Sequence, residues 1–303
     1  MRMAPARLRA RRAAFRPAIA AVAAALLLAG LGSLPGPAPA RAASAEALAM
    51  TLTPWEGFVG VGGEQFGPVA NPAGLAWLGE HALQAQYVST AGEPAGAGAR
   101  AVVYLEPDTG LGAGQLAYLS AGDDDGGLRQ YVYSAAWRRS DAAFGFSVRH
   151  VTLDNVEPAD AGVSQPVSGA AWVLDVGYRG QWARWLGVGV LARHALVSGD
   201  EEVRAAMPVE VAVGVAVELG LGLTAAADYI VPGVGNWEEA GWRYGLEGRF
   251  GRVLARLGQR VYPAGTVVSY AGLGYLLESL RLDAAVSESG GRRLLSLGLS
   301  LYF

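Results

Sequence analysis

The chain has 303 residues, of which 52% are apolar, 17% are charged and 43 are glycine. This apolar content excludes a disordered chain, and so much glycine excludes a coiled coil, because each glycine inside a helix costs roughly 1 kcal/mol. The absence of cysteine excludes disulfides, thiolate metal sites and cysteine nucleophiles.

Residues 1–42 have the pattern of a secretory signal peptide. Six arginines and no acid lie between Arg2 and Arg16. The apolar run from Ala18 to Leu31 is shorter than the ~20 residues of a membrane-spanning helix, and Ala40-Arg41-Ala42 offers a cleavage site. The alternative is an N-terminal anchor helix. The sequence predicts export, with residues 1–42 removed.

Removal of this leader changes the net charge. All 24 basic residues are arginine, and seven of them lie in residues 1–42, where there is no acid. The formal charge of −3 therefore becomes −10 in the mature chain, which keeps 17 Arg and 27 acids. Because nucleic acids are strongly negative, we expect no nucleic-acid partner.

From about residue 80 onward, apolar side chains alternate with polar or small ones, which is the pattern of β-strands. The last segment is the clearest, because leucines at every second position and Phe303 share one face. Fourteen such segments are counted, beginning near residues 81, 99, 110, 128, 142, 169, 185, 207, 219, 241, 253, 266, 279 and 293.

The connections between these segments alternate in length. Those after even-numbered segments are tight turns, and those after odd-numbered segments are mostly long and polar, as from Ser120 to Gly127, except at Pro263 to Gly265. This arrangement is typical of outer-membrane barrels. A soluble β-sandwich is the alternative, but one of its faces would carry far more charge. The sequence predicts an all-β fold over residues 81–303, a transmembrane antiparallel β-barrel of about 14 strands.

The chain ends on an aromatic residue preceded by alternating apolar residues. Leu299, Leu301, Tyr302 and Phe303 resemble the terminal signal that the outer-membrane assembly machinery reads. We therefore expect the cell outer membrane as the location, with its lipids and its assembly machinery as partners. The alternative is an ordinary last strand that ends on Phe303.

Arginines and acids occupy the face expected to point into the lumen. Ten arginines and seven acids fall on it, which favours ion pairs that cross-link a narrow barrel over a selective ion filter. The excess of arginine on the tenth to thirteenth strands would instead attract an anionic solute. The lumen charges singled out are Arg243, Glu247, Arg249, Arg256, Arg260, Arg281 and Asp283; the others are Arg100, Glu106, Arg138, Arg149, Asp175, Arg179, Arg193, Glu210, Glu218 and Asp228.

The sequence offers little support for catalysis. His81, His150 and His194 are isolated, and neither G-x-S-x-G nor H-E-x-x-H occurs. We expect no enzymatic activity, no cofactor and no metal.

Residues 43–80 do not alternate and form a predicted segment apart from the barrel. Asn71 is a good helix N-cap and Pro72 is tolerated at a first helical position, so the run Asn71-Pro72-Ala73-Gly74 indicates a capped turn or short helix. The glycines of the inward face leave room for such a plug.

The Asn-Pro-Ala-Gly run before the first strand resembles the N-terminal plug of the long-chain fatty-acid transporter family, the FadL-type outer-membrane proteins, and their PorV-like relatives. The resemblance covers residues 55–90 by motif and the rest by architecture. It implies a monomeric barrel of about 14 strands with an N-terminal hatch in its lumen. It also implies passive transport of small hydrophobic or amphipathic solutes such as fatty acids.

The chain departs from the fatty-acid transporters in being shorter and in having polar, acidic outer loops. The alternative function is therefore a sealed PorV-like barrel that serves secretion or surface-protein attachment. For Asn71 to Ala73 the alternative is a capped turn with no role in transport.

Overall fold

The computed structural model describes residues 58, 60, 71–90, 98–123, 126–156, 166–233, 240–262, 265–289 and 292–303. The predicted signal peptide, residues 1–42, and most of residues 43–70 lie outside the described residues.

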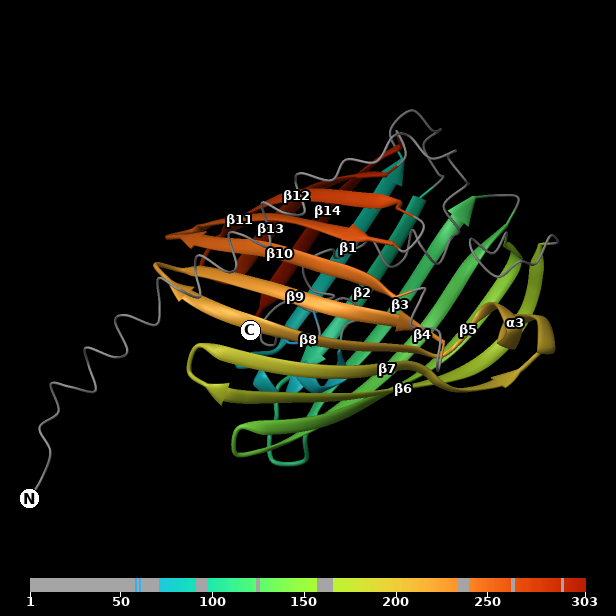
Figure 1. The fold of residues 1–303 in the computed structure, drawn as a ribbon, viewed down its shortest axis with the longest axis horizontal. Helices are drawn as coiled ribbons and strands as arrows, with labels where there is room; N and C mark the ends of the chain where they lie inside the picture. Colours follow the sequence, from blue (N-terminus) through green and yellow to red (C-terminus); the bar gives the residue numbers. More distant parts are fainter. Residues whose placement is uncertain are drawn as a thin grey trace, which may run out of the picture.

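Fourteen β-strands close into one antiparallel barrel (Figure 1). Each strand pairs with its neighbours in sequence, and β1 pairs with β14 to close the sheet. The strands are β1 (Ala82–Thr90), β2 (Gly98–Glu106), β3 (Ala113–Asp123), β4 (Gly126–Arg139), β5 (Ala142–Val156), β6 (Val167–Ala183), β7 (Leu186–Gly199), β8 (Glu210–Gly220), β9 (Leu223–Pro232), β10 (Gly241–Phe250), β11 (Val253–Val261), β12 (Val267–Leu276), β13 (Leu280–Ser289) and β14 (Arg292–Tyr302).

The predicted fold class and strand count are confirmed, and every strand begins within four residues of its expected position. One expected long link is wrong. Instead of a polar loop from Ser120 to Gly127, β3 continues to Asp123 and β4 begins at Gly126. The glycines Gly122 and Gly127 pair with each other across the two strands, so the ladder continues where polar residues suggested a loop.

Apolar side chains cover the outward face of the barrel. Leu295, Leu297, Leu299 and Leu301 of β14 are all 43% exposed or more. Large aromatic residues are exposed near both ends of the strands, for example Trp137, Phe144 and Trp182 near the tight turns and Tyr131, Trp172 and Trp242 near the long connections. An apolar band between two aromatic girdles is the surface that a barrel presents to a bilayer.

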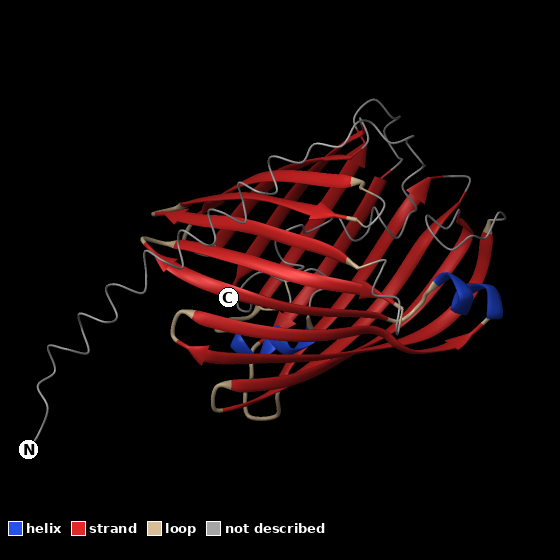
Figure 2. Cartoon of the chain, in the orientation of Figure 1, coloured by secondary structure: helices blue, strands red, loops and turns tan. Residues whose placement is uncertain are grey.

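Two short helices lie at opposite ends of the barrel (Figure 2). The 3-10 helix η1 (Pro72–Trp77) contacts β3, β4, β5 and β6 near the tight turns. The helix α3 (Glu201–Ala206) lies in the connection from β7 to β8 and contacts β6 and β7. Within the described part of the chain, no helix is long and apolar enough to cross a membrane.

The inner face of β1 to β5 carries apolar residues over both halves of its height. Near the tight turns, Ala73, Leu75 and Ala76 of η1 pack against the wall residues Ala82, Val103, Leu105, Ala113, Ala117, Val132, Ala136 and Ala143. Near the long connections, Val203 of α3 and the following Met207 pack in a second cluster with wall residues that include Val88, Ala99, Leu119, Leu128 and Val151. We call the inner faces of β1, β2 and β3 the uncharged arc, because none of their described side chains is charged; it also carries the buried glutamines Gln84 and Gln115.

Candidate functional site in the barrel lumen

Asn71 ties the start of η1 to the barrel wall. Its Oδ1 accepts a hydrogen bond from the main-chain N–H of Ala73 at 3.1 Å, which caps the helix. Its Nδ2 donates to the main-chain carbonyl oxygens of Tyr178 in β6, at 3.0 Å, and Val190 in β7, at 3.4 Å. The side chain is 2% exposed. A single buried amide therefore both caps η1 and links it to two adjacent strands.

Glycines in the wall allow the plug backbone to lie directly on the sheet. A Cβ atom on Gly177 would lie 2.0 Å from Oδ1 of Asn71, and one on Gly145 would lie 2.6 Å from the nitrogen of Ala73. A Cβ atom on Gly187 would lie 2.6 Å from the carbonyl oxygen of Gly60. Any other residue at these positions would force the plug away from the wall, so these glycines leave the room that the sequence predicted.

Two arginine side chains contact Trp77, the last residue of η1. The guanidinium carbon of Arg179 lies 3.9 Å from the ring centroid, and that of Arg138 lies 5.0 Å from it. Nε of Arg179 also donates to the carbonyl oxygen of Gly60 at 3.2 Å. Cation–π contacts of this kind contribute roughly 0.5–2 kcal/mol each, depending on burial. Two of the arginines expected in the lumen thus hold the N-terminal segment.

Phe58 contacts the opposite wall of the lumen. It is fully buried among Ala216, Ala226 and Tyr270, and the guanidinium carbon of Arg243 lies 4.8 Å from its ring centroid. The described residues of the N-terminal segment therefore touch β8, β9, β10 and β12 through Phe58 and β3 to β6 through η1. Phe58, Gly60 and residues 71–78 are the described residues of this plug.

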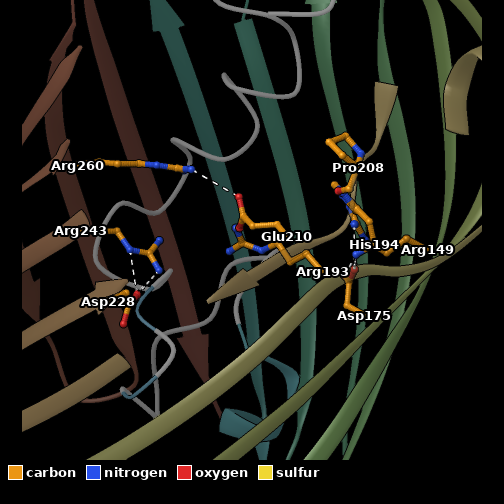
Figure 3. A network of polar contacts seen from close by, with 9 residues as sticks. All are labelled: Arg149, Asp175, Arg193, His194, Pro208, Glu210, Asp228, Arg243 and Arg260. Carbon is orange, nitrogen blue, oxygen red and sulfur yellow. Dashed lines mark hydrogen bonds and ion pairs between the residues drawn. The ribbon is translucent and has the colours of Figure 1, made fainter. Parts of the chain in front are cut away.

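A belt of ion pairs lines the lumen on the side away from the uncharged arc (Figure 3). Its members come from β5 to β11 and are largely buried. Arg149 pairs with Asp175 at 2.9 Å, Arg193 with Glu210 at 2.6 Å, Arg260 with Glu210 at 3.6 Å, and Arg243 with Asp228. These pairs bridge strands, so they cross-link the wall.

The belt also stabilises a β-bulge between β6 and β7. Arg193, His194 and Ala195 lie opposite Asp175 alone, and His194 has a φ of 53°. Oδ1 of Asp175 accepts the main-chain N–H of His194 at 2.8 Å, which supplies a partner for a backbone donor in the irregular stretch. Nδ1 of His194 lies 2.8 Å from the carbonyl oxygen of Pro208, so this histidine is a structural residue.

A second group of charges lies nearer the tight turns. Arg256 pairs with both Glu247, at 2.7 Å, and Asp283, at 2.8 Å, and Arg281 also pairs with Asp283 at 2.7 Å. With Arg243 and Arg260 in the belt, six of the seven lumen charges singled out from the sequence are in ion pairs. The seventh, Arg249, is exposed and takes part in no ion pair within the described residues.

Two residues expected in the lumen point outward instead. Arg100 and Glu106 lie in β2, whose buried inner positions are Ala99, Ala101, Val103 and Leu105. The prediction was wrong because β2 has apolar residues on both faces. Alternation alone therefore does not determine which face is inside.

The terminal residues lie at the closing seam of the barrel. Leu299 and Leu301 face outward, Phe303 stacks on His81 with a centroid distance of 5.8 Å, and Tyr302 packs against the cluster around η1. Their role as an assembly signal stays a prediction. Within the described residues, no group of three or more histidine, aspartate or glutamate side chains is arranged to hold a metal ion.

Sequence reasoning missed the contacts of Asn71, because its partners are main-chain atoms, and missed the pairing of Trp77 with Arg138 and Arg179. A usable signal existed: Gly145, Gly177 and Gly187 interrupt the inward faces of three consecutive strands.

Solved structures with a similar fold include a FadL homologue and two monoaromatic hydrocarbon channels. A Pseudomonas aeruginosa FadL homologue superposes with a TM-score of 0.56 at 11% identity, over 82% of this chain and 97% of that one. The CymD monoaromatic hydrocarbon channel gives 0.56 at 12%, over 78% and 92%. A TodX deletion variant, also a monoaromatic hydrocarbon channel, gives 0.50 at 11%, over 82% and 97%. No protein-family model and no curated protein matches the sequence. The expected FadL-like barrel fold is therefore confirmed.

Proposed function

We propose that this FadL-type barrel is an outer-membrane channel through which small hydrophobic or amphipathic solutes pass inward without an energy source. The observation that carries the proposal is the position of η1. It lies on the inner wall of β3 to β6 near the tight turns, and its Leu75 belongs to one buried apolar cluster with Leu105 of β2. The wall continues as a second apolar cluster toward the long connections. An uncharged wall that runs the height of the barrel suits an apolar solute.

The ion pairs on the charged side of the lumen favour a structural role for its arginines over attraction of anionic solutes. Arg256 already has two carboxylate partners, and Arg243 and Arg260 each face one. A carboxylate solute would have to compete with these partners for the guanidinium groups. We therefore place small hydrocarbons, such as those named for the CymD and TodX channels, beside fatty acids in the proposed solute class.

Residues 43–80 are the hatch in this proposal. The described contacts that hold it include the hydrogen bonds of Asn71, at about 0.5–1.5 kcal/mol each, and the cation–π contacts of Trp77 and Phe58, at roughly 0.5–2 kcal/mol each. They also include the burial of Phe58 and Leu75 and the hydrogen bond from Arg179 to Gly60. The closed barrel is held by continuous ladders between all fourteen strands, and release of the described plug contacts would break none of these ladders.

Solute uptake by vesicles with a lipopolysaccharide outer leaflet tests the proposal, because that leaflet slows direct diffusion of apolar molecules. The mature chain is expected to admit a radiolabelled monoaromatic hydrocarbon faster than empty vesicles do. A variant lacking residues 55–80 is expected to admit it faster still. If the deletion variant folds and its hydrocarbon uptake stays at the level of empty vesicles, the proposal of transport is wrong.

That outcome would favour the alternative function, a sealed barrel that docks a secretion apparatus or a surface protein. The inward-folded α3 favours it, since Val203 is fully buried and the helix closes the apolar cluster at the end with the long connections.

A further inference from the structure

A row of polar residues crosses the outward face of the barrel near the long connections. The cross-strand register places Tyr87 opposite Arg100, Arg100 opposite Ser120, Ser120 opposite Arg129 and Arg129 opposite Thr152. We call Arg100, Ser120 and Arg129, on β2, β3 and β4, the arginine row. Both arginines are exposed on a face that is otherwise mostly apolar.

Within the described residues, the arginine row has no acidic partner. Nε of Arg100 donates to Oγ of Ser120 at 3.1 Å. Neither Arg100 nor Arg129 forms an ion pair with a described residue, even though Asp154 lies on the outward face of the neighbouring β5. A third outward arginine near the same end, Arg293, pairs with Glu288 at 3.0 Å. Among the described residues, the outward arginine charge is therefore compensated on β13 and β14 and uncompensated on β2 to β4.

The level of the row in the membrane follows from the aromatic residues beside it. The next outward positions toward the tight turns hold Tyr118 and Tyr131, whose ring centroids are 5.1 Å apart, and His150 and Trp172, at 4.8 Å. Aromatic girdles mark the boundary between hydrocarbon and headgroups. The arginine row lies on the loop side of this girdle, where lipid headgroups are.

We propose that the arginine row binds the phosphate groups of a bisphosphorylated glycolipid of the lipid A type in the outer leaflet. Guanidinium groups form paired hydrogen bonds with phosphate oxygens. Arg100 and Arg129 stand two strand spacings apart, about 10 Å. A disaccharide with a phosphate at each end presents two such groups to one row. The aromatic girdle below meets the sugar and the start of the acyl chains.

This proposal rests on the proposed outer-membrane location and is independent of transport. Its test uses the folded mature chain in nonionic detergent, to which bisphosphorylated lipid A is added, and counts the lipid molecules retained per barrel by native mass spectrometry. The double variant Arg100→Gln with Arg129→Gln removes both charges. It is expected to lower the retention of lipid A about tenfold or more. The matched control is Arg139→Gln, an outward arginine on the same strand near the tight turns, which is expected to leave retention unchanged.

A second variant covers the case in which the double substitution does not fold. Ser120→Asp would place a carboxylate between the two guanidinium groups, and it is expected to displace the lipid while keeping both arginines. Retention equal to the unmodified chain in either folded variant overturns the proposal. The proposal is also overturned if the unmodified chain retains phosphatidylglycerol as well as it retains lipid A, and if the same variants lose both lipids. Any lipid phosphate would then suffice. Hydrocarbon uptake by the double variant is expected to be unchanged, so failure of transport and failure of lipid binding are separate results.

Discussion

The side-chain amide of Asn71 donates a hydrogen bond of 3.0 Å to the main-chain carbonyl oxygen of Tyr178, a residue 107 positions further along the chain. This bond joins the only described helix of the N-terminal segment to β6 near the tight turns. Because the acceptor is a backbone atom of β6, the contact does not depend on the side chain of Tyr178. It fails when Asn71 loses its donor.

Replacing Asn71 therefore tests the attachment of η1. Asn71→Asp keeps an acceptor for the N–H of Ala73 but removes the donor to Tyr178 and Val190, whereas Asn71→Ala removes both functions. At about 0.5–1.5 kcal/mol per hydrogen bond, amide exchange in residues 71–78 is expected to rise roughly tenfold in Asn71→Asp. It should rise further in Asn71→Ala, as measured by hydrogen–deuterium exchange. Unchanged exchange in Asn71→Asp would show that the cap alone holds the helix.

The glycine below Asn71 offers the reciprocal test. A methyl group at position 177 would overlap Oδ1 of Asn71, so Gly177→Ala is expected to release η1 and accelerate exchange in residues 71–78 while the barrel stays folded. Gly298→Ala is the control, since its Cβ would also point into the lumen but lie 3.4 Å from its nearest neighbour, the Cβ of Asp283. The same exchange pattern in both variants would contradict a close fit at Gly177.

The arginine contacts of Trp77 are expected to be unequal. A double-mutant cycle between Trp77→Leu and Arg179→Gln should give a coupling free energy of about 0.5–2 kcal/mol. The cycle with Arg138→Gln should give less, because its guanidinium is further from the ring. The readout is the free energy of plug release from amide exchange. Arg184→Gln, in the turn after β6, should show no coupling, and equal coupling for all three arginines would refute specific stacking.

Buried and exposed ion pairs should differ sharply in their effect on unfolding. Asp228 is fully buried and paired with Arg243, so the loss of its charge in Asp228→Asn is expected to cost about 3–5 kcal/mol. Glu288→Gln breaks the exposed pair with Arg293 and is expected to cost about 0–1 kcal/mol. Urea unfolding in lipid vesicles measures both. A comparable loss in the two variants would mean that the belt does not stabilise the barrel.

Hydrophobic alternation was sufficient to locate the strands, because a lipid-facing side chain is required at every second position whatever the tertiary contacts are. The same rule failed for Arg100, which lies in a strand with apolar residues on both faces. There the facing is decided by pairing with β1 and β3, where Ala101 meets Leu119 and Gln86 on the inside. The sequence of a single strand does not reveal which residues pair with it.

The plug was predictable as a segment but not as a set of contacts. The cap at Asn71 follows from local residue preferences, and the structure shows it. The attachment to Tyr178 and Val190 does not, because any residue could supply those carbonyl oxygens. The close contact of the plug with Gly145 and Gly177 depends on which inward positions the plug backbone crosses, and the closed barrel determines those positions.

A reversible lock between plug and wall tests the central claim most directly. The chain has no cysteine, and a Cβ atom on Gly177 would lie 3.1 Å from Cγ of Asn71, a separation that suits the sulfur-to-Cβ distance across a disulfide. In the double variant Asn71→Cys with Gly177→Cys, oxidation should reduce hydrocarbon uptake to the level of empty vesicles. Reduction should restore it to at least that of the unmodified chain. Uptake that is the same in both states would contradict a solute path gated by the plug.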